Sequence, residues 1–197
     1  MKSIVCISGS SRPDNYTARA LAVTADELRA LGAETIDIDA RKLTLPFPGQ
    51  PDTADARHLR ERVAEAGAVV LASPEYHGSF SAMTKLIIEN LGYPSVMAGK
   101  PVALLGVAAG RIGAIKTIEQ LRGVCAHTGA IVIPGAVSVA GVRGAFDVEG
   151  RITDAATEKA LRGLAAALIG FMQDYVCPKY ALEALVRQEA APWAAEL

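Results

Sequence analysis

The sequence predicts one α/β domain built on a doubly wound parallel sheet of five strands in the order 2-1-3-4-5. Short apolar segments alternate five times with longer segments of helical periodicity along the 197 residues. Several of the short segments are apolar at every position, as in strands that helices cover on both faces. Five strands favour this order over the six-stranded dinucleotide-binding arrangement.

The first half of the chain supplies three strands and their helices. Residues 4–7 are an apolar strand. The next helix carries Leu21 and Leu28 on one face, and Gly32 ends it. Residues 45–51 are rich in proline and are expected to form a loop. In order, we predict strand 4–7, helix 17–31, strand 35–38, helix 55–66, strand 68–72 and helix 81–91.

The second half continues the alternation and ends in a tail. We predict strand 102–107, helix 112–127, strand 131–134 and helix 154–175. Residues 141–150 form a polar insertion that we interpret as a surface loop. Pro178 is expected to end the last helix, which divides the chain into a domain over residues 1–175 and a partly helical tail over 176–197. The tail either packs on its own domain or covers a partner subunit.

Composition and charge exclude several classes of protein. A net charge of −1 without a basic run argues against nucleic-acid binding. No apolar run reaches about 18 residues, so we expect no membrane span. The first residues lead straight into a strand and do not resemble a signal peptide. Three cysteines without a C-x-x-C pair predict reduced thiols, no disulfide framework and a cytoplasmic protein.

The loop after the first strand is suited to a phosphate group. Residues 8–17 (SGSSRPDNYT) are small and rich in hydroxyls, and they lead into a helix N-terminus that Thr17 is expected to cap. Such a terminus presents free N–H groups and the positive end of the helix dipole. Ser10, Thr17 and backbone N–H groups can surround a phosphate, and Arg12 can add a charge-assisted bond.

Two further loops are suited to a flat heterocycle. Ligands of open parallel sheets bind at the carboxyl ends of the strands, where the loops after strands 1, 3 and 4 meet. Residues 73–81 (SPEYHGSFS) join a stiff proline turn to Gly78, which allows close backbone approach, and Ser81 is expected to cap the next helix. Residues 108–113 (AAGRIG) carry few bulky side chains, so their N–H groups can reach a ring and stabilise negative charge on it.

Other catalytic motifs are missing from the sequence. Neither G-x-G-x-x-G after the first strand nor G-x-x-x-x-G-K-[ST] occurs, which disfavours a dinucleotide fold and a P-loop. Ser79 and Ser81 lack a G-x-S-x-G elbow. His58, His77 and His127 lack metal-ligand spacing. We therefore predict no catalytic side chain and no metal site.

Three segments resemble the NADPH-dependent FMN reductases, which include quinone, azo-dye and chromate reductases of flavodoxin-like fold. Residues 7–12 (ISGSSR) are similar to the phosphate loop of that family, and residues 73–79 (SPEYHGS) to its S-P-E-Y-N-G-S flavin loop. Residues 121–134 are similar to its fourth helix and fifth strand. The resemblance covers about residues 1–171.

The resemblance implies an FMN-dependent oxidoreductase that passes hydride from NADPH, with NADH as a possible donor, to a quinone, free flavin or similar small-molecule acceptor. The cofactor itself carries the chemistry. Family members are commonly dimers or tetramers, so the resemblance also implies a homodimer or homotetramer. Carried over by position, the cofactor-binding residues are Ser10, Arg12, Asn15 and Thr17 at the phosphate, Pro74, Glu75, Tyr76, His77 and Gly78 along the isoalloxazine, and Ala109, Gly110 and Arg111 at its far edge.

Two departures from the family pattern and two alternatives stay open. His77 replaces the usual asparagine, and residues 88–91 (IENL) lack the tryptophan often found in that helix. Arg12 or Arg111 is a candidate to meet a 2′-phosphate of NADPH. The first alternative function is a flavin-binding electron carrier or redox sensor without turnover, although flavodoxins are strongly acidic and use a T-x-T-G-x-T loop. The second is an interaction protein that kept the fold and lost the cofactor.

Overall fold

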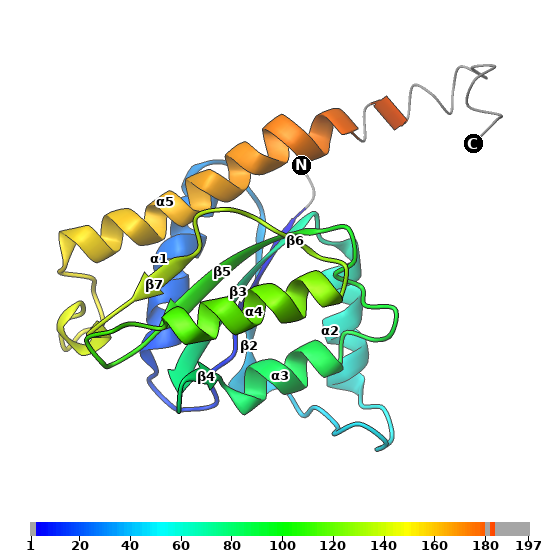
Figure 1. Ribbon diagram of the computed structural model, residues 1–197, viewed down its shortest axis with the longest axis horizontal. Helices are drawn as coiled ribbons and strands as arrows, with labels where there is room; N and C mark the ends of the chain where they lie inside the picture. Colours follow the sequence, from blue (N-terminus) through cyan, green and yellow to red (C-terminus); the bar gives the residue numbers. More distant parts are fainter. Residues whose placement is uncertain (1–2, 180–181, 184–197) are drawn as a thin grey trace.

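A parallel sheet forms the centre of the molecule (Figure 1). The computed structural model describes residues 3–179 and 182–183. The strand order is β2-β1-β3-β5-β6, with β7 also paired to β5, and all of these pairs are parallel. The predicted doubly wound, flavodoxin-like order is thereby confirmed. The strands are β1 Ile4–Ser8, β2 Thr35–Asp39, β3 Ala68–Tyr76, β5 Pro101–Val107, β6 Ile131–Val132 and β7 Val137–Val139.

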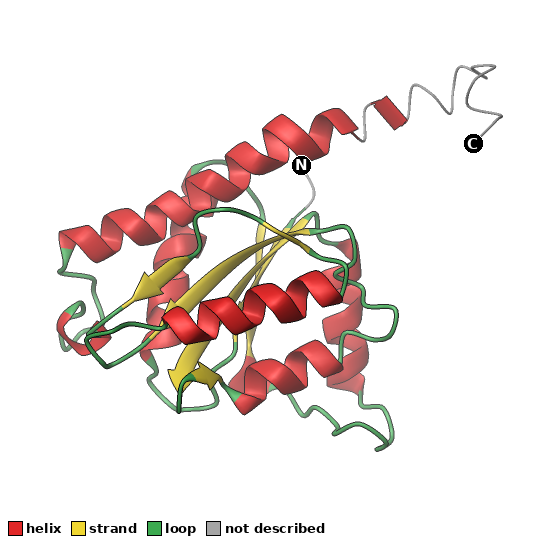
Figure 2. Cartoon of the chain, viewed as in Figure 1, coloured by secondary structure: helices red, strands yellow, loops and turns green. Residues whose placement is uncertain are grey.

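Helices cover both faces of the sheet (Figure 2). Successive residues of a strand point to opposite faces, so Ile4 of β1 packs with α1 and α5, whereas Val5 packs with α2, α3 and α4. Both side chains are fully buried, as the all-apolar strand pattern predicted. The helices are α1 Tyr16–Ala30, α2 Ala54–Glu65, α3 Ala82–Glu89, α4 Ile115–His127 and α5 Ala155–Phe171, and η1 Ala40–Lys42 is a short 3-10 turn.

The fifth strand is divided into two pieces, which the sequence analysis did not predict. Val132 pairs with Val102 and Val137 with Leu105, so residues 133–136 of the outer strand span only two residues of β5. Gly135 lies in this bulge with a φ of 79°, a conformation that glycine adopts without steric cost. The second piece, β7, carries the chain up to the carboxyl edge of the sheet, where the following turn begins.

The last helix continues past its proline. After α5, the five residues Met172–Val176 form a π-helical turn, and residues 177–179 are again α-helical. The prediction that Pro178 ends the helix is therefore wrong. A proline clashes with the carbonyl four residues earlier in a regular α-helix, and the π turn shifts that carbonyl out of α-helical register.

Most of the predicted tail lies outside the described residues, which exclude 180–181 and 184–197. The domain boundary after residue 175 and the role of the tail stay predictions. Within the described part of the chain, no helix has the length and apolar character needed to cross a membrane.

Candidate functional site

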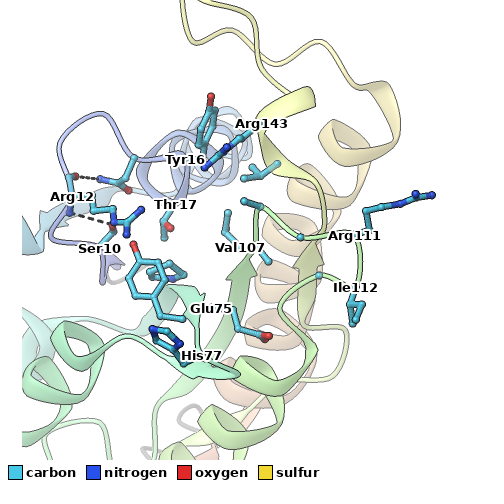
Figure 3. A pocket seen from close by; sticks show the side chains of 18 of the residues that line it. Ser10, Arg12, Tyr16, Thr17, Glu75, His77, Val107, Arg111, Ile112 and Arg143 are labelled. Atoms are coloured by element: carbon cyan, nitrogen blue, oxygen red, sulfur yellow. Dashed lines mark hydrogen bonds between the residues drawn. The ribbon is translucent and has the colours of Figure 1, made fainter.

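A cavity of about 610 Å³ opens at the carboxyl edge of the sheet, where the loops after β1, β3 and β5 meet the turn after β7 (Figure 3). Open parallel sheets bind their ligands at this edge, beside the point where strand order reverses. Every residue that the sequence singled out as a cofactor contact lines this cavity, while the contacts with FMN themselves stay a prediction. The set is Ser10, Arg12, Asn15, Thr17, Pro74, Glu75, Tyr76, His77, Gly78, Ala109, Gly110 and Arg111.

The first loop ends in a capped helix N-terminus. Asn15, and not Thr17 as predicted, is the N-cap of α1, because its Oδ1 accepts a hydrogen bond of 2.8 Å from the N–H of Ala18. Its Nδ2 donates to the Arg12 carbonyl at 2.8 Å and so fixes the loop. Thr17 instead lies in the first turn, where backbone N–H groups have no helical acceptor. The side chains of Ser10 and Thr17 are buried at the floor of the cavity.

Arg12 joins the first loop to the second. Its guanidinium lies over the Tyr76 ring, with 5.0 Å between Cζ and the ring centroid. This cation–π contact orients the guanidinium of the exposed Arg12 beside the cavity. The Arg12 N–H also donates to Ser10 Oγ at 3.4 Å. The cation therefore stands beside the buried hydroxyls and the helix terminus.

The second loop is a tight hairpin that periodicity did not reveal. Strand β3 runs on to Tyr76 and pairs antiparallel with β4, Ser79–Phe80. The two residues between them, His77 and Gly78, have φ values of 52° and 74°. Two positive φ values in a two-residue hairpin define a type I′ turn, for which Asn-Gly is the favoured pair. The asparagine that usually precedes this glycine in the resembled family therefore suits the backbone conformation of the turn. His77 adopts the same conformation here.

Helix α4 holds the hairpin in place. Glu75 Oε2 accepts a bond of 3.1 Å from the N–H of Thr117, in the first turn of a helix whose own N-cap residue, Ala114, makes no side-chain cap. A carboxylate is stabilised at this positive end of the helix. Gln120 donates through Nε2 to the Gly78 carbonyl at 2.9 Å and accepts from Ser79 Oγ at 2.7 Å. Glu75 and Gln120 thus fix the hairpin to helix α4.

The third loop, residues 108–113, exposes its backbone at the cavity. Ala109 and Gly110 are exposed there, and the loop closes at Gly113, whose φ is 85°. A Cβ on Gly113 would lie 2.7 Å from Ser138 Oγ, too close for any side chain. Ser138 Oγ accepts from the N–H of Ala114 at 2.8 Å and so fixes the loop where α4 begins.

A buried hydroxyl cluster connects the first and second loops. It consists of Ser73, Ser81 and Thr84, all nearly inaccessible to solvent. Ser81 caps α3, as predicted, by accepting from the Thr84 N–H at 3.0 Å, and it donates to the Gly9 carbonyl at 2.5 Å. Thr84 Oγ1 donates to Ser73 Oγ at 2.9 Å. Gly9 is required here because a Cβ would lie 2.0 Å from Thr84 Oγ1.

The turn after β7 is a fourth wall of the cavity that the sequence analysis missed. Val142 and Arg143 line the cavity, although residues 141–150 were expected to be a surface loop away from any site. The N–H of Gly141 donates to the Gly110 carbonyl at 2.9 Å, and that of Val142 to the Ala108 carbonyl at 3.1 Å. The alternation Val-Ser-Val at 137–139 was the available signal, because a strand there delivers the next turn to the same edge.

Charged side chains of both signs line the cavity. Its cations are Arg12, Arg111 and Arg143, and its carboxylates are Asp14 and Glu75, of which Glu75 is bonded to the first turn of α4. Figure 3 shows the Arg111 side chain directed away from the cavity and the Arg143 side chain beside Tyr16 at its rim.

The buried thiols take no part in this site. Burial raises the pKa of Cys6 and of Cys125 to about 12, so both stay protonated at neutral pH. Neither lines the cavity, and both pack in the two cores.

Comparison with known proteins places the chain among flavoenzymes. Residues 2–144 match the family model of the NADPH-dependent FMN reductases. A 2-hydroxy-1,4-benzoquinone reductase from Burkholderia sp. is 31% identical over 134 residues, which cover 63% of this chain and 70% of that one. An NADPH azoreductase from Bacillus sp. is 31% identical over 142 residues, covering 71% and 77% of the two chains.

Solved structures agree on the fold. A flavoenzyme NAD(P)H:(acceptor) oxidoreductase from Paracoccus denitrificans superposes with a TM-score of 0.72 at 24% identity, covering 89% of this chain and 99% of that one. A flavodoxin from Streptococcus pneumoniae gives a TM-score of 0.58 at 17% identity, covering 85% and 97%. These likenesses show the flavodoxin-like fold.

Proposed function

The chain belongs to the NADPH-dependent FMN reductase family, and we propose that FMN lies in the cavity at the carboxyl edge of its sheet. The protein is accordingly an NAD(P)H-dependent oxidoreductase that uses FMN. The observation that supports this placement is the convergence of four turns on one cavity whose two ends differ in chemistry. One end offers hydroxyls, a helix terminus and a cation, and the other offers the backbone of the hairpin at His77 and Gly78 and of the loop at Ala109 and Gly110.

The residues at the first end fit the phosphate of FMN. Ser10 and Thr17 present buried hydroxyls, and the first turn of α1 presents backbone N–H groups with the positive end of its dipole. Arg12 adds a guanidinium that can bind two phosphate oxygens at once. Asn15 contributes as the cap that fixes this terminus, since both ends of its amide are already bonded within the loop.

The residues at the second end fit the isoalloxazine. Pro74 to Gly78 form one edge, where His77 and Gly78 of the type I′ turn line the cavity. Ala109 and Gly110 leave their N–H groups accessible at the other edge, where charge develops on reduction. FMN, when bound, supplies the hydride-accepting centre. The protein's own residues bind it, orient it and leave the mouth of the cavity open to a second ligand.

The acceptor is a small flat molecule of the quinone, free flavin or azo class. The benzoquinone reductase and the azoreductase among the relatives support this proposal. An anaerobic absorption experiment tests it: NADPH should bleach the visible band of the FMN-loaded protein, and benzoquinone should restore it. Failure of NADPH to bleach the band of bound FMN would support an electron carrier or sensor without turnover instead.

The phosphate end can be tested separately with a matched pair of arginines. Arg12 and Arg19 each lie over a tyrosine ring, at 5.0 and 5.2 Å, but only Arg12 lines the cavity. Loss of a charge-assisted bond costs about 1.5–3 kcal/mol, so Arg12→Ala should raise the FMN Kd roughly 10- to 100-fold. Arg19→Ala should leave it unchanged. Equal Kd values for both variants would place the phosphate elsewhere.

We also propose a homodimer or homotetramer in the cytoplasm, with FMN bound by residues 1–175. Ile112 and Ile115 stand 84% and 50% exposed beside the cavity, which supports burial of this rim in an assembly. Three cysteines without a disulfide among the described residues support a reducing compartment. Light scattering during gel filtration measures the assembly, and a monomeric mass would exclude it.

A further inference from the structure

We infer that Arg143 binds a phosphate group of the incoming nicotinamide nucleotide at the rim of the cavity. This inference rests on the proposed function, because it assigns a residue to the second ligand of the same site. Arg143 lies outside the three strand-end loops from which the sequence predicted the cofactor contacts.

The backbone around Arg143 is fixed to the wall of the cavity. It lies in the 3-10 turn Val142–Gly144, which begins after Gly141 in a left-handed conformation with φ of 55°. The N–H groups of Gly141 and Val142 donate to the loop after β5, and Val142 is 2% exposed. The Arg143 side chain therefore projects from a rigid support and is not carried by a free loop.

The guanidinium of Arg143 makes no ion pair with any described residue, in contrast to Arg151 and Arg162. Arg151, in the same insertion, pairs with Asp147 at 2.8 Å and Glu149 at 3.2 Å. Arg162 on α5 pairs with Glu158 and Glu27. A cation that lines a cavity without a carboxylate partner is available to an anionic ligand, and guanidinium matches phosphate oxygens in bidentate geometry.

The position of Arg143 favours the nucleotide over FMN. The groups assigned to the FMN phosphate include the buried Ser10 and Thr17 on the cavity floor, and Arg12 already supplies a cation there. Arg143 is exposed at the rim beside Tyr16, and Arg111, the other rim arginine, points away (Figure 3). Burial of a charged phosphate is costly, so a nucleotide whose nicotinamide enters the cavity should keep its phosphates on the solvent side, where Arg143 is exposed.

Steady-state kinetics on the FMN-loaded protein test the inference. Arg143→Gln should raise the KM for NADPH about 5- to 20-fold with kcat and the FMN Kd unchanged, since one exposed charge-assisted bond is lost. The dependence of that KM on salt should weaken, because a rim charge attracts the ligand through screened electrostatics. Arg143→Lys should recover part of the loss. Arg151→Gln is the control, because its charge is neutralised by its own carboxylates.

Comparison of NADPH with NADH identifies which phosphate group Arg143 binds. An effect on NADPH alone assigns the 2′-phosphate, and an equal effect on NADPH and NADH assigns the pyrophosphate; both support the inference. Titration of NADP⁺ into the FMN-loaded protein should show the same loss of affinity without turnover. Unchanged KM values, or a loss of FMN affinity in Arg143→Gln, would overturn the inference. Wild-type protein whose FMN neither nucleotide reduces would refute the proposed function as well.

Discussion

Removal of the Ser81 hydroxyl should loosen the joint between the two loops that we assign to FMN. Ser81 Oγ accepts from the Thr84 N–H as the cap of α3 and donates to the Gly9 carbonyl at 2.5 Å. A lost N-cap costs about 1 kcal/mol, and a lost buried hydrogen bond costs about 1–2 kcal/mol. Ser81→Ala should therefore lower the free energy of unfolding by about 2–3 kcal/mol and the Tm by roughly 5–10 °C.

A second helix cap supplies the matched control. Thr53 likewise accepts from the N–H of Ala56 at 3.2 Å as the cap of α2 and donates to the Thr44 carbonyl at 2.7 Å, but the second bond is exposed to solvent and Thr53 does not line the cavity. Thr53→Ala should cost about 1 kcal/mol and leave FMN affinity unchanged. Urea unfolding of the apoproteins and FMN titration measure both quantities. Ser81→Ala should in addition raise the FMN Kd, because it loosens the joint between the two loops. Equal destabilisation of the two variants with an unchanged FMN Kd in Ser81→Ala would refute this.

Four further measurements follow from the structure. His77→Asn should raise the free energy of unfolding by about 0.5 kcal/mol in urea and keep FMN binding, because asparagine suits the first position of a type I′ turn better; a lower urea midpoint would contradict this. Glu75→Gln should cost about 0.5–1 kcal/mol in urea, because an amide oxygen keeps the Thr117 bond but loses the charge at the helix terminus; an unchanged midpoint would contradict it. Because burial raises the pKa of Cys6 and Cys125 to about 12, the unfolded thiols lose protons first, so stability should be intact below pH 9 and fall as pH rises toward 12. Native protein at pH 8 should accordingly react with alkylating reagent only at the exposed Cys177 among these three, and fast labelling of all three would count against the packing.

The sequence predicted the sheet and the location of the site for the same physical reason. Apolar segments such as residues 68–72 can bury both of their faces only between two layers of helices. Parallel strands then bring the loops that follow them to one edge of the sheet. Polar and glycine-rich residues in the loops after strands 1, 3 and 4 were therefore expected to meet, and they line one cavity.

The missed features depend on local conformations that residue patterns specify poorly. The hairpin needs a positive φ at His77, which is uncommon in any residue other than glycine, so the short strand β4 was not expected. The bulge at residues 133–136 interrupts the last strand, so neither β7 nor the position of the turn that carries Arg143 was predicted. Asn15 and Thr17 are neighbouring polar residues of types that can cap a helix. Only the backbone geometry determines which of them caps α1.

A crystal structure of the FMN complex tests the central claim most directly. The account predicts the phosphate against Ser10, Thr17 and Arg12, and the ring between the Pro74–Gly78 hairpin and the loop at Ala109. A phosphate bound away from the N-terminus of α1, or a ring held outside this cavity, would contradict it.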